Sequence, residues 1–276
     1  MTGATIAPAG PDHRAAFRAA TFGDVLRSEW TKLRSVRSTS WALAVTVVLG
    51  IGLGAVISAA SAHGYAKSGV SGKLSWDPTA VSLDGMGIAT LAIAVLGVLC
   101  ISSEYSSGMI RTSLIAVPQR GRVLAAKSLV FAVATFVVGE VTSFTAFFVG
   151  QDLISGHAPR AALGDPGVAR AVVGAGLVLT ALAVLSVAAG TLLRHPAAAI
   201  ACMIAVLFVL PGIAQALPDS WRNPVTEFWP TQAGSQLTNV YHSAHTLQPW
   251  PGFGVMCLFA AVVYAIAWTL LDRRDA

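Results

Sequence analysis

Charged residues are scarce in this chain, and their scarcity excludes a soluble fold. Of 276 residues, 11% are charged and 55% are hydrophobic. A soluble domain carries roughly a quarter charged residues. Nucleic-acid binding needs a basic patch on a soluble face, and no segment here builds one, so no nucleic-acid partner is expected. We therefore expect an integral membrane protein whose surroundings are the lipid bilayer.

Motifs of catalysis and metal binding are also missing. The sequence contains no GxxxxGK[ST] loop for nucleotide phosphates, no HExxH and no GxSxG. The three cysteines lie within apolar runs, and their number and spacing fit no metal site. His242 and His245 stand three residues apart without a carboxylate or cysteine motif, so no metal site is predicted. The chain is expected to be non-catalytic and to hold no cofactor of its own.

Six apolar runs are each long enough to cross a bilayer, which takes about 20 residues. They lie at about 40–62, 85–103, 123–150, 168–193, 197–217 and 251–271. Pro211 predicts a kink in the fifth span. Gly50 and Gly54 have GxxxG spacing, but chance is our preferred interpretation in a chain so rich in Ala and Gly. The predicted fold class is all-α, a polytopic membrane protein with six transmembrane helices.

The N-terminal part divides into two segments ahead of the six-span domain, 40–276. Residues 1–20 are rich in Ala, Pro and Gly and are interpreted as a disordered cytoplasmic tail. Residues 21–39 predict an amphipathic elbow helix in the lipid headgroup layer, starting at a capping box of Thr21 and Asp24. The alternative is an amphipathic helix packed on protein. Its apolar face holds Phe22, Leu26, Trp30 and Leu33.

Lys and Arg residues gather on one side of the predicted spans. Of the 18, 13 fall on the side that holds both ends of the chain and the 104–127 stretch, and five on the other. Cytoplasmic loops carry the excess of basic residues. We therefore predict a multi-pass protein of the plasma membrane with both termini in the cytoplasm.

The external segment 218–250 is rich in Pro and Trp. Two interpretations stay open. It forms short helices that dip into the outer leaflet, or it is a Pro-rich surface loop anchored by Trp side chains, which favour the membrane interface.

The stretch 104–127, between spans two and three, is the most informative part of the chain. It holds four basic residues and one acid. Ile110, Leu114 and Val117 recur at helical spacing before Pro118, which predicts a short amphipathic helix at the cytoplasmic surface. A basic loop that follows the positive-inside rule explains the composition equally well.

Nine residues of this stretch resemble a pattern of ABC transporter permease subunits of the type 2 exporter class. They are Glu104, Tyr105, Gly108, Ile110, Arg111, Leu114, Pro118, Arg120 and Lys127. In that family the segment forms the coupling helix that contacts the ATPase. The resemblance implies that Glu104, Gly108, Ile110, Arg111, Leu114 and Pro118 couple this chain to a separate cytoplasmic ABC ATPase. It also implies a second permease copy or paralogue, with ATP and Mg on the ATPase.

Glu140 is the only acid well inside a predicted span, in the third. A charge at membrane depth is costly, so such a residue usually faces a cavity or a partner. It is a candidate intramembrane polar site on a substrate path or in proton linkage. The alternative is an acid whose hydrogen bonds hold two spans together.

The resemblance implies export of a lipophilic or amphipathic compound, driven by ATP. Two other functions are the alternatives. An integral membrane enzyme acting on lipids needs polar groups that converge near one leaflet, and the sequence offers only isolated candidates. A non-transporting anchor or sensor leaves the size of the 104–127 segment unexplained.

Overall fold

The protein is helical, and the computed structural model describes residues 21–109, 119–241 and 246–273 of it. Within these ranges there is no strand. Six helical segments are long and apolar enough to cross a membrane. They are Thr39–Tyr65, Met86–Ser106, Arg120–Ile154, Val168–Leu193, Pro196–Ala214 and Pro249–Arg273. The predicted all-α fold with six apolar spans is confirmed.

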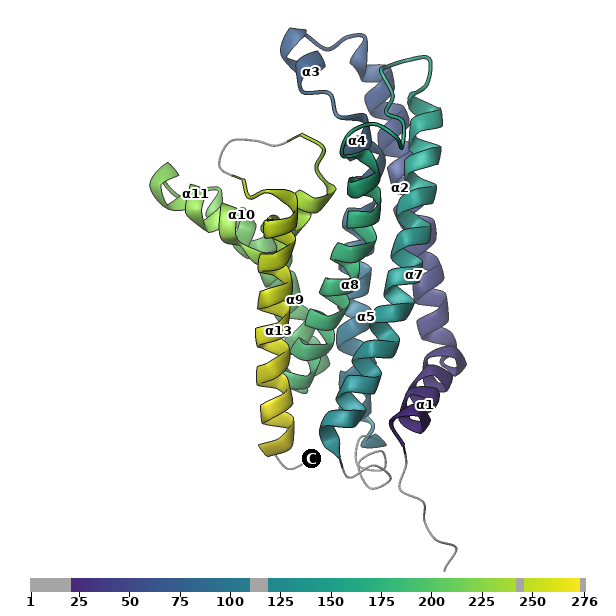
Figure 1. Ribbon diagram of the computed structural model, residues 1–276, viewed down its shortest axis with the longest axis vertical. Helices are drawn as coiled ribbons and strands as arrows, with labels where there is room; N and C mark the ends of the chain where they lie inside the picture. The colour runs from purple at the N-terminus through teal and green to yellow at the C-terminus, as the bar shows by residue number, and fades with distance from the viewer. Residues whose placement is uncertain (1–20, 110–118, 242–245, 274–276) are drawn as a thin grey trace, which may run out of the picture.

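The first helix, α1 (Phe22–Ser35), begins at the expected capping box. The backbone N–H of Asp24 donates to the Thr21 hydroxyl (3.3 Å), and the backbone N–H of Thr21 donates to the Asp24 carboxylate (2.9 Å). These bonds satisfy backbone donors that the first turn leaves open. At Val36 the backbone becomes extended, which ends α1 before α2 (Arg37–Tyr65) begins. The break lets α1 turn away from α2 and pack against α7 (Figure 1).

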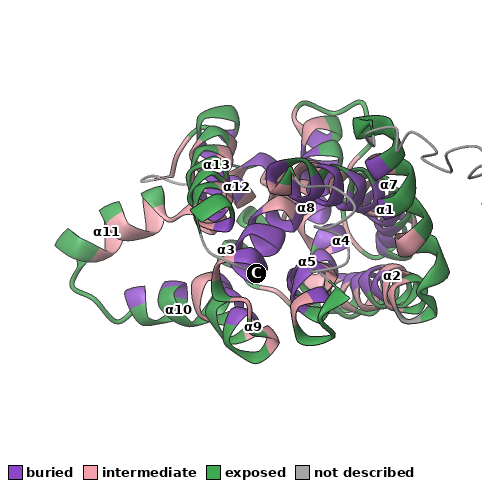
Figure 2. Cartoon of the chain, turned by 90° about the horizontal axis from the view of Figure 1, so that it is seen from below, coloured by how far each residue is buried: buried purple, intermediate pink, exposed green. Residues whose placement is uncertain are grey.

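Three long helices form the centre of the bundle. They are α5 (Met86–Ser106), α7 (Arg120–Ile154) and α8 (Val168–Leu193), and Figure 2 shows buried residues gathered where they meet. Their side chains Ile93, Phe131 and Leu179 belong to one buried cluster. The helices α2, α9 (Pro196–Ile204) and α13 (Pro249–Arg273) pack around this centre. The outer helices leave much of their surface exposed, as expected for a face turned to lipid.

Gly50 and Gly54 allow α2 to approach its neighbours closely. A Cβ atom on Gly50 would lie 2.8 Å from the Thr142 side chain of α7. A Cβ on Gly54 would lie 2.9 Å from the Ser82 carbonyl oxygen. Both distances are shorter than van der Waals contact, so larger residues would separate the helices. The interpretation of this GxxxG spacing as chance is therefore wrong.

Two short helices, α3 (Val70–Leu74) and α4 (Pro78–Leu83), lie at the end of the bundle opposite α1 (Figure 1), and α4 packs against α2 and α7. Buried Gln151 fixes this end. Its side-chain amide donates to the Pro78 carbonyl and to the Ser82 hydroxyl, both at 2.8 Å. Its amide oxygen accepts from the Ala161 backbone N–H at 2.7 Å. One side chain thus connects α7 to α4 and to the loop before α8.

The fifth span is irregular at Pro211, where the sequence predicts a kink. The helix widens into a π-helical turn, η1 (Ala205–Val209), and continues as α10 (Leu210–Ala214). Proline has no backbone N–H to bond the carbonyl four residues earlier, here that of Leu207, and π turns accommodate such gaps. Beyond it, α10 and α11 (Asp219–Phe228) extend to one side of the bundle in both views (Figures 1 and 2).

Part of the segment 218–250 packs against helices of the bundle. The helix α12 (Pro230–Ser235) and the 3-10 turn η2 (Gln236–Thr238) lie against α8 and α13. Leu237 is fully buried against Gly174, which lies six residues, about 9 Å, into α8. The Arg170 guanidinium donates to the Leu237 and Asn239 carbonyls, each at 2.8 Å. The surface-loop interpretation is therefore wrong for 230–238, which packs beside the spans.

The side of the membrane that each end faces is a testable prediction. We expect a cysteine at exposed Gln119, introduced after Cys100, Cys202 and Cys257 are replaced, to resist an impermeant thiol reagent in intact cells. It should react once the cells are permeabilised. Cysteine at exposed Lys73, at the opposite end, is the control and should react in intact cells. Labelling of position 119 in intact cells would contradict the predicted orientation.

Candidate functional site

The two ends of the 104–127 stretch lie at one end of the bundle, beside α1 and the end of α13 (Figure 1). Glu104 and Gly108 are described. Ile110, Arg111, Leu114 and Pro118 lie outside the described residues, and so does Val117. The coupling helix expected there remains a prediction. The described part of the site consists of the residues on each side of it.

Gly108 turns the chain out of α5. Its φ of +72° is in the left-handed region, two residues past the last helical residue, Ser106. Glycine adopts this conformation without the steric cost that a Cβ atom adds. No atom lies within 4 Å of where that Cβ would be, so the backbone conformation alone requires glycine. Gly108 therefore sets the direction in which the chain leaves α5.

Four charged side chains form a cluster at the base of α1, α5 and α7. The Lys127 ammonium of α7 donates to Glu29 of α1 (2.6 Å) and to Glu104 of α5 (2.8 Å). Lys32 of α1 donates to the same two acids, at 2.7 Å to Glu29 and 3.2 Å to Glu104. Two acids and two bases thus alternate in a closed arrangement. We call these four residues the charge cluster.

The charge cluster is buried on one side and open on the other. The side chain of Lys127 is 3% exposed, and that of Lys32 is 32% exposed. Burial by itself raises the pKa of the Glu29 carboxyl, but Lys127 and Lys32 outweigh it and hold that pKa below its ordinary value. The acid is therefore charged at neutral pH. Formal charges sum to zero, which limits the cost of placing ions away from water.

Two other residues of the pattern, Tyr105 and Arg120, contact α8 and α13. The Tyr105 ring lies 5.3 Å from the guanidinium carbon of Arg194, at the turn between α8 and α9. The Arg120 guanidinium donates to the Leu271 carbonyl of α13 at 3.3 Å. The next residue, Gly121, packs so closely on Trp268 that a Cβ there would overlap the indole. Each of these contacts ties the 104–127 stretch to a different helix.

These contacts make the ends of the stretch a junction. At the end of α5, Glu104 pairs with Lys32 of α1 and Tyr105 contacts Arg194 at the end of α8. At the start of α7, Arg120 bonds to α13 and Lys127 bonds to α1. The described residues on either side of 110–118 therefore contact α1, α8 and α13 as well as each other.

Glu140 lies between α7 and α8, facing Gly176. A Cβ on Gly176 would overlap the Glu140 carboxyl group. Both carboxyl oxygens are buried, and no described residue forms a hydrogen bond with either. Among the described residues, the interpretation of Glu140 as an acid that hydrogen-bonds two spans together is thus wrong. The polar-site hypothesis stays open, because an ionisable residue within a span is by default a candidate for function.

The histidines form no metal site in the described part of the chain. His63 and His157 have ring centroids 4.4 Å apart at the α4 end, whereas His242 and His245 lie outside the described residues. No group of three or more His, Cys, Asp or Glu suited to a metal occurs among the residues that are described. The two placed rings stack on each other.

Sequence reasoning identified Glu104 and Lys127 as members of a pattern but missed their partner Glu29. The sequence predicts an apolar face on α1 that includes Leu26 and Trp30. The helix instead buries Val25 and Glu29, which lie four residues apart on one side. The Glu29–Lys32 pair at i, i+3 gave no signal of this burial, because such pairs are also common on exposed helix faces. No family model and no curated protein matched the chain. The resemblance to exporter permeases therefore rests on the sequence pattern alone and supports a proposal.

Proposed function

We propose that this chain is the transmembrane permease subunit of an ATP-driven ABC exporter. Two permease chains, identical or paralogous, pair with two cytoplasmic ATPase subunits that carry ATP and Mg. The six apolar spans support a permease, and the pattern at 104–127 supports this class. The chain has no phosphate-binding loop of its own, so ATP hydrolysis belongs to the partner.

The observation that carries the proposal is the anchoring of the 104–127 stretch. Its first and last residues, Glu104 and Lys127, pair with each other at 2.8 Å and share Glu29 and Lys32 of α1 as neighbours. A simple connecting loop needs no buried ion pair at its base. A segment that transmits force does, because its ends must move together with the helices they join.

The proposed transmission follows from these contacts. Closure of the ATPase dimer displaces the segment between Gly108 and Gln119. The charge cluster keeps α1, α5 and α7 together during that movement, and Arg120 carries it to α13. The helices of the two permeases then separate on the outer side. A lipophilic or amphipathic compound passes along the path between them.

The alternative of a lipid-modifying enzyme has less support. Its catalytic groups would have to converge on an open space near one leaflet. The carboxylates of Glu29 and Glu104 instead pair with two lysines in a packed junction. Glu140 is held against Gly176 between two helices.

Substituting Ile110 and Leu114 by aspartate tests the proposal. We expect the double variant to lose co-purification of the ATPase and substrate-stimulated ATP hydrolysis while it remains in the membrane. Apolar anchors supply most of the affinity when a short helix enters a groove, and a charge in a desolvated contact costs several-fold to several-hundred-fold in binding. Pull-down from co-expressing cells, with yields compared by immunoblot, gives the measurement.

A matched control separates docking from a general effect of added charge. Val70 and Leu74 in α3 are exposed at the opposite end of the bundle and have the same i, i+4 spacing as Ile110 and Leu114. Aspartate at both positions should leave ATPase binding unchanged. Should the Ile110 and Leu114 variant bind its ATPase and transport at the wild-type level, the stretch is only a basic loop and the proposal fails.

A further inference from the structure

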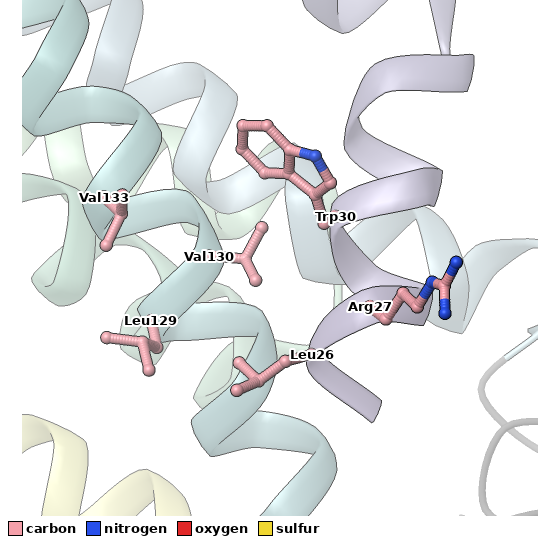
Figure 3. A pocket seen from close by; sticks show the side chains of 6 residues that line it. All are labelled: Leu26, Arg27, Trp30, Leu129, Val130 and Val133. Carbon is pink, nitrogen blue, oxygen red and sulfur yellow. The ribbon is translucent and has the colours of Figure 1, made fainter. Parts of the chain in front are cut away.

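A groove opens between α1 and α7 near the charge cluster. It has a volume of about 360 Å³. Its lining is apolar except for one residue: Leu26, Arg27 and Trp30 of α1, and Leu129, Val130 and Val133 of α7 (Figure 3). Leu26 and Trp30 lie toward Val130 in this view, whereas the Arg27 guanidinium points away from the apolar side chains.

The groove continues into an apolar ridge along α7. Leu129, Val133, Val137 and Val141 are spaced four residues apart, so they share one face of the helix, and each is about half exposed. From Leu129 to Val141 the helix rises about 18 Å. One leaflet of the hydrocarbon core is about 15 Å thick. The ridge therefore matches the length of one lipid acyl chain.

The α1 side of the groove is basic. Arg27, Trp30 and Arg34 follow at spacings of three and four on α1, which places them on one face. All three are exposed, and neither arginine has a salt bridge to a described residue. Trp30 is of the type that settles at the membrane interface, and Lys127 is the last charged residue of α7 before its apolar stretch. The groove thus begins at headgroup depth.

We propose that this groove is a binding site for one anionic glycerophospholipid. An acyl chain fills the space beside Val130 and follows the ridge to Val141. The lipid phosphate is bound by the guanidinium groups of Arg27 and Arg34. Arginine suits this role because its planar donors pair with phosphate oxygens in a bidentate manner. The inference is independent of ATP-driven transport, since it rests only on α1 and α7.

A lipid explains the groove better than a second copy of the chain does. A protein partner on this face would have to cover the whole ridge and also pair with two arginines that form no ion pair with a described residue. The described carboxylates of α1, Asp24 and Glu29, are engaged in the capping box and the charge cluster. A phospholipid meets both requirements at once, with an anion for the arginines of α1 and an apolar chain of matching length for the ridge of α7.

Native mass spectrometry of the purified full chain tests the site. The protein in mild detergent is titrated with phosphatidylglycerol or with phosphatidylcholine of identical acyl chains. We expect one tightly retained lipid, with phosphatidylglycerol preferred about fivefold or more, since each basic residue near an anionic headgroup contributes about that factor. Arg27→Gln should reduce this preference, and Arg27→Gln with Arg34→Gln should abolish it.

Groove filling and two controls complete the design. Val133→Trp should remove the retained lipid of either headgroup, because the indole occupies the space of the acyl chain. Arg37→Gln and Val48→Trp change exposed residues of α2 outside the groove and should bind as the wild type does. The proposal fails if the wild type shows no headgroup preference, or if Arg37→Gln matches Arg27→Gln. It also fails if Val133→Trp keeps its lipid. A third contrary result is a wild type that forms a dimer without lipid and a Val133→Trp variant that is monomeric, because the groove would then bind a second copy of the chain.

Discussion

Replacing Lys127 with methionine is expected to destabilise the protein more than any other single change in the charge cluster. The substitution leaves the Glu29 and Glu104 carboxylates buried with only the partly exposed Lys32 to pair with. Removing one partner of a buried ion pair typically costs about 3–5 kcal/mol. For a chain of this size that corresponds to a fall of roughly 10 °C in the midpoint of thermal unfolding. Size-exclusion chromatography of heated, fluorescently tagged protein measures that midpoint.

Two further variants separate burial from charge. Lys32→Met removes the same charge from the same two acids at a more exposed position, and its effect should be about 1 kcal/mol or less. The triple variant Glu29→Met, Glu104→Met and Lys127→Met should recover most of the stability lost in Lys127→Met. Apolar replacement of a whole buried ion group is often neutral. Equal midpoints for Lys127→Met and Lys32→Met would show that water reaches Lys127.

The recovered triple variant also separates stability from coupling. If the charge cluster transmits movement from the ATPase, the triple variant should bind the ATPase but show weakened substrate stimulation of ATP hydrolysis. A fully stimulated triple variant would mean that the cluster only positions α1. The loss of stimulation is read against ATPase binding in the same preparation, so the two effects do not merge.

Glu140→Lys is the second change with a large expected effect. The carboxyl group is packed against Gly176, and its oxygens have no hydrogen-bond partner among the described residues. A fixed cation in this position has to be desolvated within the bundle, which costs about 3 kcal/mol or more. We expect the variant to be lost before or soon after insertion. Yield of folded protein in the membrane fraction measures this outcome.

Conservative variants at Glu140 should behave differently. Glu140→Gln keeps the size of the side chain and should insert nearly normally. Glu140→Met should be as stable as the wild type or more stable, because an unpaired buried polar group is itself a cost. Asp152→Lys makes the same charge change on an exposed part of α7 and is the control. Normal yield of Glu140→Lys would mean that this position reaches water.

Transport by the stable variants then decides the role of Glu140. A Met variant that is stable but inactive would place Glu140 on the substrate path or in proton linkage. A Met variant that is stable and active would remove Glu140 from the mechanism.

The sequence by itself determined the helical class and the six spans. Both follow from local composition, because the bilayer requires about 20 apolar residues per helix and sets the same rule for every span. Span limits were predicted within a few residues, except where helices continue past the apolar run, as α7 does to Arg120 and Ile154. The capping box at Thr21 was also readable, since its bonds join residues three apart.

Only the tertiary structure decided which residues meet across the sequence. Glu29 and Lys127 are 98 positions apart, and no local pattern distinguishes an acid that faces water from one that faces a buried lysine. The spacing of Gly50 and Gly54 gains its meaning from α4 and α7, which lie against these residues. The burial of 230–238 likewise depends on its contacts with α8 and α13. Hydropathy indicates whether a helix lies in the bilayer or in water. The partner of a buried charge or a glycine is set by the packing of whole helices.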